Sequence, residues 1–399
     1  MRILFEPIGG ALGIGAITRC LAMAQAATMR GHQVGFLAPD GYPLIDELDL
    51  GERFRAPFPE RTAELVGSGE ADGFTEAVLI RGMAQPDYVR AAVDAEVSAY
   101  RTFRPDIVVT EMQPTVPIAA HITGIPFACT VQSPNLAAFT GPSDRPELCA
   151  QVEATFAALA REHGLPAPNS LEGLLHQRAA VNIAPTAEVL EPALGSLPRT
   201  RYVGPVLLPS LELAPAPRYD DAEIRILVYL SFGALTLDTF LPVIAKAFPV
   251  PRHSVIVAAR DKDVGGREVP FRQDNVIVAR TPGITRLLQD TDLVITRGGQ
   301  NALMAALLAG VPVIGTPGRS SEPIFNLGAL QAHGAALTLL DEPNSDDLAD
   351  AADTLLSRNA GQHAARLGEL LRRHGGPVEA VEALEQAVVA HRSPTPEAH

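Results

Sequence analysis

Cysteine, tryptophan and basic residues are all scarce in this sequence. Its 399 residues include no tryptophan and three cysteines, which are Cys20, Cys129 and Cys149. So few cysteines exclude a disulfide framework and the paired spacing of a zinc site. The 32 basic residues are outnumbered by 46 acidic ones, and the formal net charge is −14 at pH 7. A surface this acidic argues against nucleic acid or an anionic membrane as the main partner.

Apolar runs that could cross a bilayer are missing as well. One uncharged stretch of 21 residues lies between Arg297 and Arg319. Glycines and two prolines interrupt it, so it is read as a loop, a helix, a turn and a buried strand, and no integral membrane segment is expected. The opening residues MRILFEPIGG have none of the features of a secretory signal, which favours a cytoplasmic location.

What the sequence does contain is ample material for buried cores, with 47% apolar and 20% charged residues. Short apolar strands alternate with helix-like segments, a pattern that predicts parallel sheets flanked by helices. A proline-rich stretch interrupts this pattern and is read as a linker. We predict an α/β protein with a Rossmann-like domain over residues 1–205, a linker over 206–223, a second Rossmann-like domain over 224–385 and a tail over 386–399.

The two predicted domains begin alike. RILFEPIGGAL starts at Arg2, and RILVYLSFGAL starts at Arg225. Each reads as the first strand and glycine loop of a doubly wound domain.

The most informative stretch places a glycine pair between a strand and a helix. The pattern predicts a strand over 293–296, then Arg297, Gly298 and Gly299, then a helix over 300–309 that ends at Gly310. The amides at a helix start point at an anion, and the helix dipole favours negative charge there. Arg297 adds a cation that can bond two phosphate oxygens. The sequence therefore predicts a diphosphate site.

The stretch from Asn275 to Leu340 resembles the donor-binding region of GT-B glycosyltransferases, whose two Rossmann-like domains face each other across a cleft. Enzymes that glycosylate natural products of the antibiotic or macrolide type, and the peptidoglycan N-acetylglucosaminyltransferase, are similar here. The first 40 residues and the position of the linker share the resemblance. It implies that the donor-binding residues are Ser231, Gly233, Arg280, Thr281, Pro282, Arg297, Gly298, Gly299, Gln300, Asn301, Ser321, Glu322 and Asn326.

Two positions depart from the family pattern. Many uridine-diphosphate-sugar enzymes carry a ribose-binding glutamate where this chain has Ala305, and this leans towards a dTDP sugar, whose ribose has one hydroxyl fewer. The second departure is Ala16, which stands where the resemblance expects the histidine base. An inverting transfer needs a group that takes the proton of the acceptor hydroxyl, and alanine cannot do so.

Three explanations of Ala16 compete. It is an engineered His-to-Ala change that traps substrates, or the enzyme uses another base such as Glu111, or catalysis has been lost. We favour the first, because the surrounding residues still indicate an intact site. The resemblance also places Glu111 where an acidic residue orients the histidine. The candidate acceptor-binding residues are Gly13, Gln113, Ser133 and Asn135.

The expected function is an inverting, metal-independent transfer of a sugar from a dTDP or UDP sugar to a small natural-product acceptor, with no separate cofactor. Asp290 and Asp292 form a D-x-D pair, but they precede a buried strand and are read as turn residues, not metal ligands. A nucleotide-sugar 2-epimerase of the same architecture and a non-catalytic nucleotide-sugar-binding protein stay open. So does a homodimer.

Overall fold

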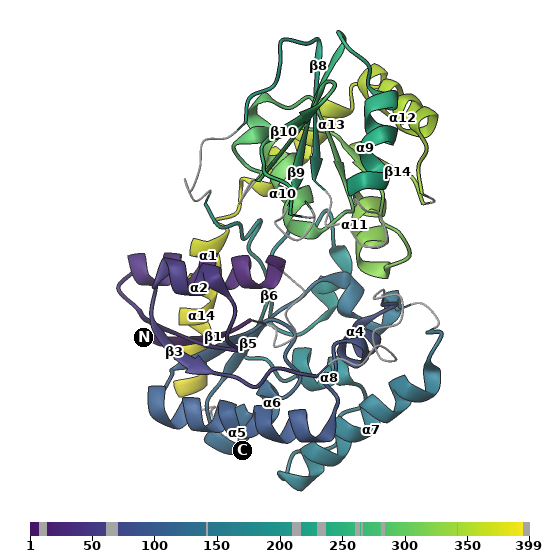
Figure 1. The fold of residues 1–399 in the computed structure, drawn as a ribbon. Helices are drawn as coiled ribbons and strands as arrows, with labels where there is room; N and C mark the ends of the chain where they lie inside the picture. Colours follow the sequence, from purple (N-terminus) through teal and green to yellow (C-terminus); the bar gives the residue numbers. More distant parts are fainter. Residues whose placement is uncertain are drawn as a thin grey trace. The chain divides into compact units, whose positions relative to one another are not determined.

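The computed structural model describes residues 1–7, 14–60, 71–140, 143–209, 217–229, 237–259, 264, 266–280, 284–340 and 342–393. These residues belong to two compact units (Figure 1). The first unit comprises residues 1–208 and 374–399, and the second comprises residues 209–373.

A parallel sheet of seven strands forms the centre of the first unit, in the order β3-β2-β1-β4-β5-β6-β7. Ile3 of β1 pairs with Val34 of β2 on one side and with Ile107 of β4 on the other. The inner strands β1, β2, β4, β5 and β6 are largely buried, as expected for a sheet covered on both faces, whereas the edge strands β3 and β7 are more exposed. Their bounds are β1 Arg2–Glu6, β2 Gln33–Ala38, β3 Glu52–Arg55, β4 Ile107–Thr110, β5 Phe127–Thr130, β6 Val181–Ala184 and β7 Thr200–Tyr202.

Helices connect these strands and cover the sheet (Figure 1). The long helix α5 buries one stripe, including Val89, Val93 and Tyr100, against the core. The α-helices are α1 Ile14–Met29, α2 Pro43–Leu48, α4 Phe74–Ile80, α5 Pro86–Phe103, α6 Val116–Thr123, α7 Pro146–Glu162, α8 Leu171–His176 and α14 Pro377–Arg392, and the 3-10 helices are η1 Ser133–Asn135, η2 Ala137–Phe139 and η3 Pro192–Ser196.

Helix α14 differs from the sequence-based division of the chain, which placed residues up to 385 in the second domain and began a tail at 386. The helix runs to Arg392 and belongs to the first unit, where it packs against α1 (Figure 1). Its apolar stripe, with Val381 and Leu384, is buried in the same core as Leu21 of α1. Glu385 pairs with Arg30 at 2.9 Å on the polar side. The packing of this stripe explains why the helix leaves the second unit.

The second unit repeats the arrangement. Its sheet has the order β10-β11-β9-β8-β12-β13-β14, and only β10 is antiparallel to its neighbour. The strands are β8 Ile224–Tyr229, β9 His253–Ala259, β10 Phe271–Gln273, β11 Val276–Arg280, β12 Leu293–Thr296, β13 Val313–Gly315 and β14 Ala336–Thr338. The helices are α9 Leu237–Ala247, η5 Leu287–Asp290, α10 Gln300–Ala309, α11 Ser321–Ala332, α12 Ser345–Ser357 and α13 Ala360–Leu371.

The repeated R-I-L sequences have equivalent places in the two units. β1 lies between β2 and β4, and β8 lies between β9 and β12. In both sheets this is the place where the order of the strands reverses, and doubly wound proteins bind ligands at the carboxyl edge of such a place. The predicted fold class of two Rossmann-like domains is confirmed. Among the described residues, no helix is both long enough and apolar enough to cross a membrane.

Candidate functional site

Two helices of the second unit begin at the same edge of its sheet. Strands β12 and β13 are parallel neighbours, so their carboxyl ends lie side by side. Helix α10 starts at Gln300, directly after β12 and the Arg297–Gly299 turn, and α11 starts at Ser321 after β13. Helix starts present backbone amides and the positive end of the helix dipole. This edge is therefore suited to an anion.

Gly298 is a glycine for structural reasons. Its φ angle is +94°, a conformation that residues with a Cβ rarely adopt. A Cβ at this position would also lie 2.7 Å from Cδ1 of Leu327 and 3.0 Å from the carbonyl oxygen of Pro323. The side chain of Asn326 donates from Nδ2 to the Gly298 carbonyl over 3.2 Å. Helix α11 thus holds the turn that precedes α10.

Gly299 has neither of these constraints. It is the residue before the first turn of α10, its φ of −62° and ψ of 132° are ordinary, and a Cβ built on it would contact nothing within 4 Å. It is also exposed, in contrast to Gly298. Packing does not require a glycine here. Its lack of a side chain leaves the start of α10 open to a ligand, which is what a bound diphosphate needs.

Arg297 fixes the loops that follow β12 and β13 to each other. Its Nη2 donates to the carbonyl oxygen of Pro317 over 3.0 Å, and the side chain is half-buried. A guanidinium has five N–H donors, and this contact uses one of its nitrogens. Contact of Arg297 with the donor diphosphate stays a prediction.

The other predicted donor residues are distributed along the same edge. Gln300 and Asn301 open α10, Ser321 and the exposed Glu322 open α11, and the exposed Arg280 ends β11. Because β11 and β12 belong to the parallel part of the sheet, Arg280 and Arg297 follow strand ends at one edge. Their contacts with a donor stay predictions. Ser231, Gly233, Thr281 and Pro282 lie outside the described residues.

In the first unit, Glu111 is held by an arginine that the sequence analysis did not single out. Arg19 of α1 donates from Nε to Oε1 and from Nη2 to Oε2 of Glu111, each over 2.8 Å. Both side chains are more than 90% buried. A carboxylate whose two oxygens both accept from a guanidinium is poorly placed to take a proton from a substrate. The geometry gives Glu111 a structural role at the end of β4.

Ala16 lies in the first turns of α1, three residues before Arg19, so the two share a face of the helix. It is 8% exposed and belongs to the apolar core that contains Leu4. The predicted position of the missing base is thus close, along the helix, to the Arg19–Glu111 pair. Arg19 follows Ala16 by three residues, and residues at this spacing lie on one face of a helix. This spacing was the one signal in the sequence that could have indicated Arg19.

The predicted acceptor residues are mostly engaged inside the first unit. Gln113 donates from Nε2 to Tyr88 over 3.2 Å and to Thr115 over 2.8 Å. Asn135 accepts from the amide of Gln132 over 3.0 Å, within the turn after β5. Ser133, in the same turn, is fully buried. Gly13 lies outside the described residues, and contact of the other three with an acceptor stays a prediction.

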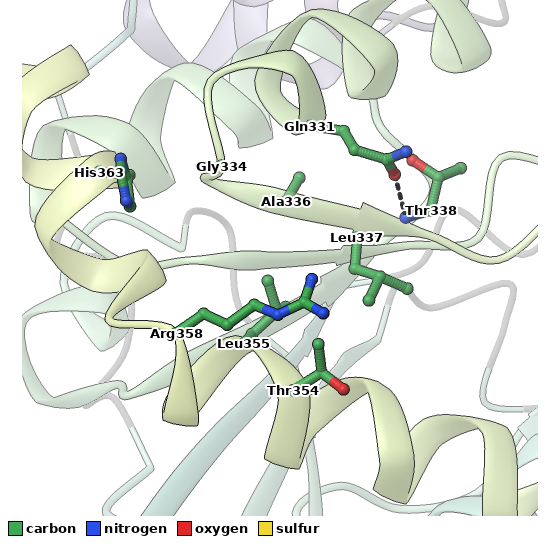
Figure 2. Close-up of a pocket in the computed structure, with 9 residues that line it drawn as sticks. All are labelled: Gln331, Gly334, Ala336, Leu337, Thr338, Thr354, Leu355, Arg358 and His363. Atoms are coloured by element: carbon green, nitrogen blue, oxygen red, sulfur yellow. Dashed lines mark hydrogen bonds between the residues drawn. The ribbon is translucent and has the colours of Figure 1, made fainter.

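A separate hollow of about 330 Å³ lies beside the edge strand of the second sheet (Figure 2). It is bordered by the edge strand β14 and by α11, α12 and α13. The side chain of Gln331 accepts from the amide of Thr338 over 2.8 Å on one side, and Arg358 reaches in from the other (Figure 2). None of the predicted donor residues lines it.

The D-x-D pair has the structural role expected of it. Asp292 accepts from the Arg225 amide over 2.8 Å and pairs with the side chain of Arg225 at 3.0 Å, at the entry to β12 and β8. Across the residues that the structure describes, no group of histidine, cysteine and acidic side chains is placed to hold a metal ion.

No protein-family model matches the chain. Among curated proteins, the PGL/p-HBAD biosynthesis glycosyltransferase of Mycobacterium tuberculosis is 24% identical in an alignment 389 residues long. The alignment covers 92% of this chain and 87% of that protein. The uncharacterized UDP-glucosyltransferase YdhE of Bacillus subtilis is 22% identical over 213 residues, about half the length of either protein at 53% each.

The solved structures give a clearer result for the fold. The glycosyltransferase of kitacinnamycin superposes with a TM-score of 0.76 at 19% identity, over 97% of this chain and 98% of that one. The fold is that of the GT-B glycosyltransferases. The spinosyn rhamnosyltransferase SpnG, solved with thymidine diphosphate, has a TM-score of 0.70 at 16% identity. The superposition covers 96% of this chain and 100% of that one. SpnG has also been solved with the spinosyn aglycone. The predicted resemblance to natural-product glycosyltransferases is confirmed, whereas that to the peptidoglycan enzyme stays a prediction.

Proposed function

We propose that this protein is a glycosyltransferase that moves a sugar from a nucleoside diphosphate donor to a small natural-product acceptor. The observation that carries the proposal is the exposed Gly299 at the start of α10, beside a Gly298 that packing requires. A helix start left open in this way, next to the guanidinium of Arg297, fits a diphosphate. The names of the similar proteins support this donor class and a natural-product acceptor.

In the proposed reaction an acceptor oxygen attacks the anomeric carbon from the side opposite the diphosphate. The bond from the sugar to the diphosphate breaks, and the configuration inverts. The amides at the start of α10 and Arg297 stabilise the negative charge that develops on the leaving diphosphate. No metal ion is required in this proposal. The dTDP sugar is the preferred donor, on the grounds of Ala305 and of the thymidine diphosphate bound by SpnG.

The proton of the acceptor needs a base, and Ala16 supplies none. The pairing of Glu111 with Arg19 weakens the second explanation, in which Glu111 is the base. We therefore keep the engineered His-to-Ala change as the leading explanation. A non-catalytic nucleotide-sugar-binding protein is the second candidate function, and the observation that favours it is Ala16 itself.

Calorimetry with dTDP and UDP tests the donor site. We expect dTDP to bind, and the variant Arg297→Ala to bind it about 10-fold or more weakly, because a charged hydrogen bond is lost. Unchanged affinity would remove Arg297 from the site, and no binding of either nucleotide would overturn the proposal.

The variant Ala16→His tests the catalytic part. A glycosyltransferase that has lost its base gains transfer to an acceptor when the histidine is restored, by about 100-fold or more. A protein that binds nucleotide sugar equally well with either residue, and transfers with neither, is the binder. Incubation with donor alone separates a 2-epimerase, which converts the sugar without an acceptor.

A further inference from the structure

Two carboxyl groups that the proposed reaction does not use are buried together in the first unit. Glu6 ends β1 and is 3% exposed, and Glu96 on α5 is 2% exposed. Burial raises the pKa of Glu6 to about 8, and burial together with the nearby Glu6 raises that of Glu96 well above its ordinary value. Burying two negative charges side by side is unfavourable in free energy unless a bound proton or a cation neutralises the charge.

The two carboxyl groups line one narrow hollow. Gln113 and Tyr88 complete its polar part, and its other lining residues are apolar. None of the described lining residues carries a positive charge. The room inside corresponds to about one water-sized group. A cation that compensates the pair must therefore come from outside the described chain.

Acceptor atoms around the hollow still have bonding capacity. Oε2 of Glu96 and Oε1 of Gln113 are buried without a hydrogen-bond partner in the described part of the chain. Oε1 of Glu6 is buried beside the hydroxyl of Tyr100, a donor that favours the charged form of Glu6. Other atoms of the same groups are satisfied. Thr115 donates to Glu96 Oε1, and the Gln113 amide nitrogen donates to Thr115. The network thus fixes the acceptors, and within the described residues no hydrogen bond reaches Oε2 of Glu96 or Oε1 of Gln113.

We infer that this hollow binds an ammonium group between Glu6, Glu96 and Gln113. The group is either the free ammonium ion or the primary amino end of a larger ligand. An ammonium group matches a water molecule in size and has N–H donors for all three acceptors. Divalent ions fit less well, because Ca²⁺ takes six to eight oxygen ligands and Mg²⁺ requires an octahedron. The inference does not depend on the proposed glycosyltransferase activity.

Thermal unfolding of the full chain at pH 8 tests the inference, with ammonium chloride compared with tetramethylammonium chloride at equal ionic strength. Tetramethylammonium has the same charge, but it is too large and donates no hydrogen bond. At about five times the dissociation constant, ammonium is expected to raise the unfolding midpoint by about 2–4 °C over the reference salt. Methylammonium is the second probe: a similar rise identifies the amino end of a larger ligand, and no rise identifies the free ion.

The variants Glu96→Gln and Glu6→Gln are each expected to abolish the difference between the salts. If one of these two variants fails to fold, the other alone still tests the inference. Glu76→Gln is the matched control, since Glu76 is a buried glutamate of the same unit that does not line the hollow, and it should respond like the unaltered protein. Equal midpoints in the two salts would overturn the inference and indicate a shared proton alone. A response that persists in both glutamine variants would place the ion elsewhere and overturn it as well.

Discussion

Leu327 of α11 packs where a side chain on Gly298 would have to lie, since a Cβ on that glycine would come within 2.7 Å of the leucine Cδ1. Gly315, which ends β13, faces the same leucine, and its Cβ would come within 2.3 Å. One side chain thus fits α11 against the ends of two neighbouring strands. This packing fixes the turn that precedes α10, and with it the direction in which the first amides of that helix point.

Because the two glycines of this turn differ, their alanine variants should separate folding from binding. Gly298→Ala is expected to lower the free energy of unfolding of the second unit by about 1–3 kcal/mol, since φ is positive and Leu327 must move. Gly299→Ala should unfold within about 1 kcal/mol of the unaltered protein, yet bind dTDP about 10- to 100-fold more weakly. Calorimetry and thermal unfolding check this. Equal binding by Gly299→Ala and the unaltered chain would contradict the proposed diphosphate site.

The buried pair of Arg19 and Glu111 should behave as a structural pair. Glu111→Gln leaves the guanidinium buried without its counter-charge, and is expected to lower the free energy of unfolding by about 3–5 kcal/mol. Adding Arg19→Met should recover most of the loss, because neither charge then remains. Urea unfolding of the two single variants and the double variant measures the coupling. Independent effects that simply add would show that the bidentate contact contributes nothing, and would restore Glu111 as a candidate base.

The pH dependence of stability should reflect the carboxyl pair of Glu6 and Glu96. Because the pKa of Glu6 is about 8 in the folded protein, against 4.5 as its ordinary value, the folded state holds a proton that the unfolded chain releases. This contribution to stability is complete below about pH 4.5 and is lost as the pH rises towards 8, by an amount on the order of 4 kcal/mol. The unfolding midpoint in tetramethylammonium buffers measures this decline.

A buried histidine has the opposite effect at lower pH. Burial lowers the pKa of His176 to about 4, so stability is lost as the pH falls from about 6.5 towards 4. Between about pH 6.5 and 8 only the carboxyl pair should contribute to the slope. The double variant Glu6→Gln with Glu96→Gln is expected to flatten the curve there. Between about pH 4.5 and 6.5 it should uncover the acid-side loss due to His176, which the carboxyl pair offsets in the unaltered protein. A slope that survives in the double variant would refute this assignment.

Local patterns in the sequence predicted much of the second unit correctly. The strand over 293–296 and the helix over 300–309 were predicted with the bounds that the structure has. The apolar run, the glycine pair and the terminating Gly310, whose φ is +73°, are all local signals. In the first unit, the strand over 107–110 was equally clear, because a proline precedes it and all four of its residues are apolar or β-branched.

What local patterns could not give were contacts between distant residues. The partner of Glu111 lies 92 residues away, on a helix. Likewise, Glu6 looks like a solvated charge at a strand end until α5 brings Glu96 beside it. The membership of α14 was missed for the same reason, since its apolar stripe fits either unit by composition. Tertiary packing alone decides these cases.

The return of α14 to the first unit has a consequence for how the protein is made. A ribosome synthesises residues 1–208 before the second unit, but the helix that covers α1 emerges only after the second unit. The apolar residues around Leu21 in the nascent first unit therefore stay uncovered while about 165 residues of the second unit are translated. Expression of either half alone would leave an apolar face without its cover, whereas a circular permutant that begins at α14 would have its cover from the start.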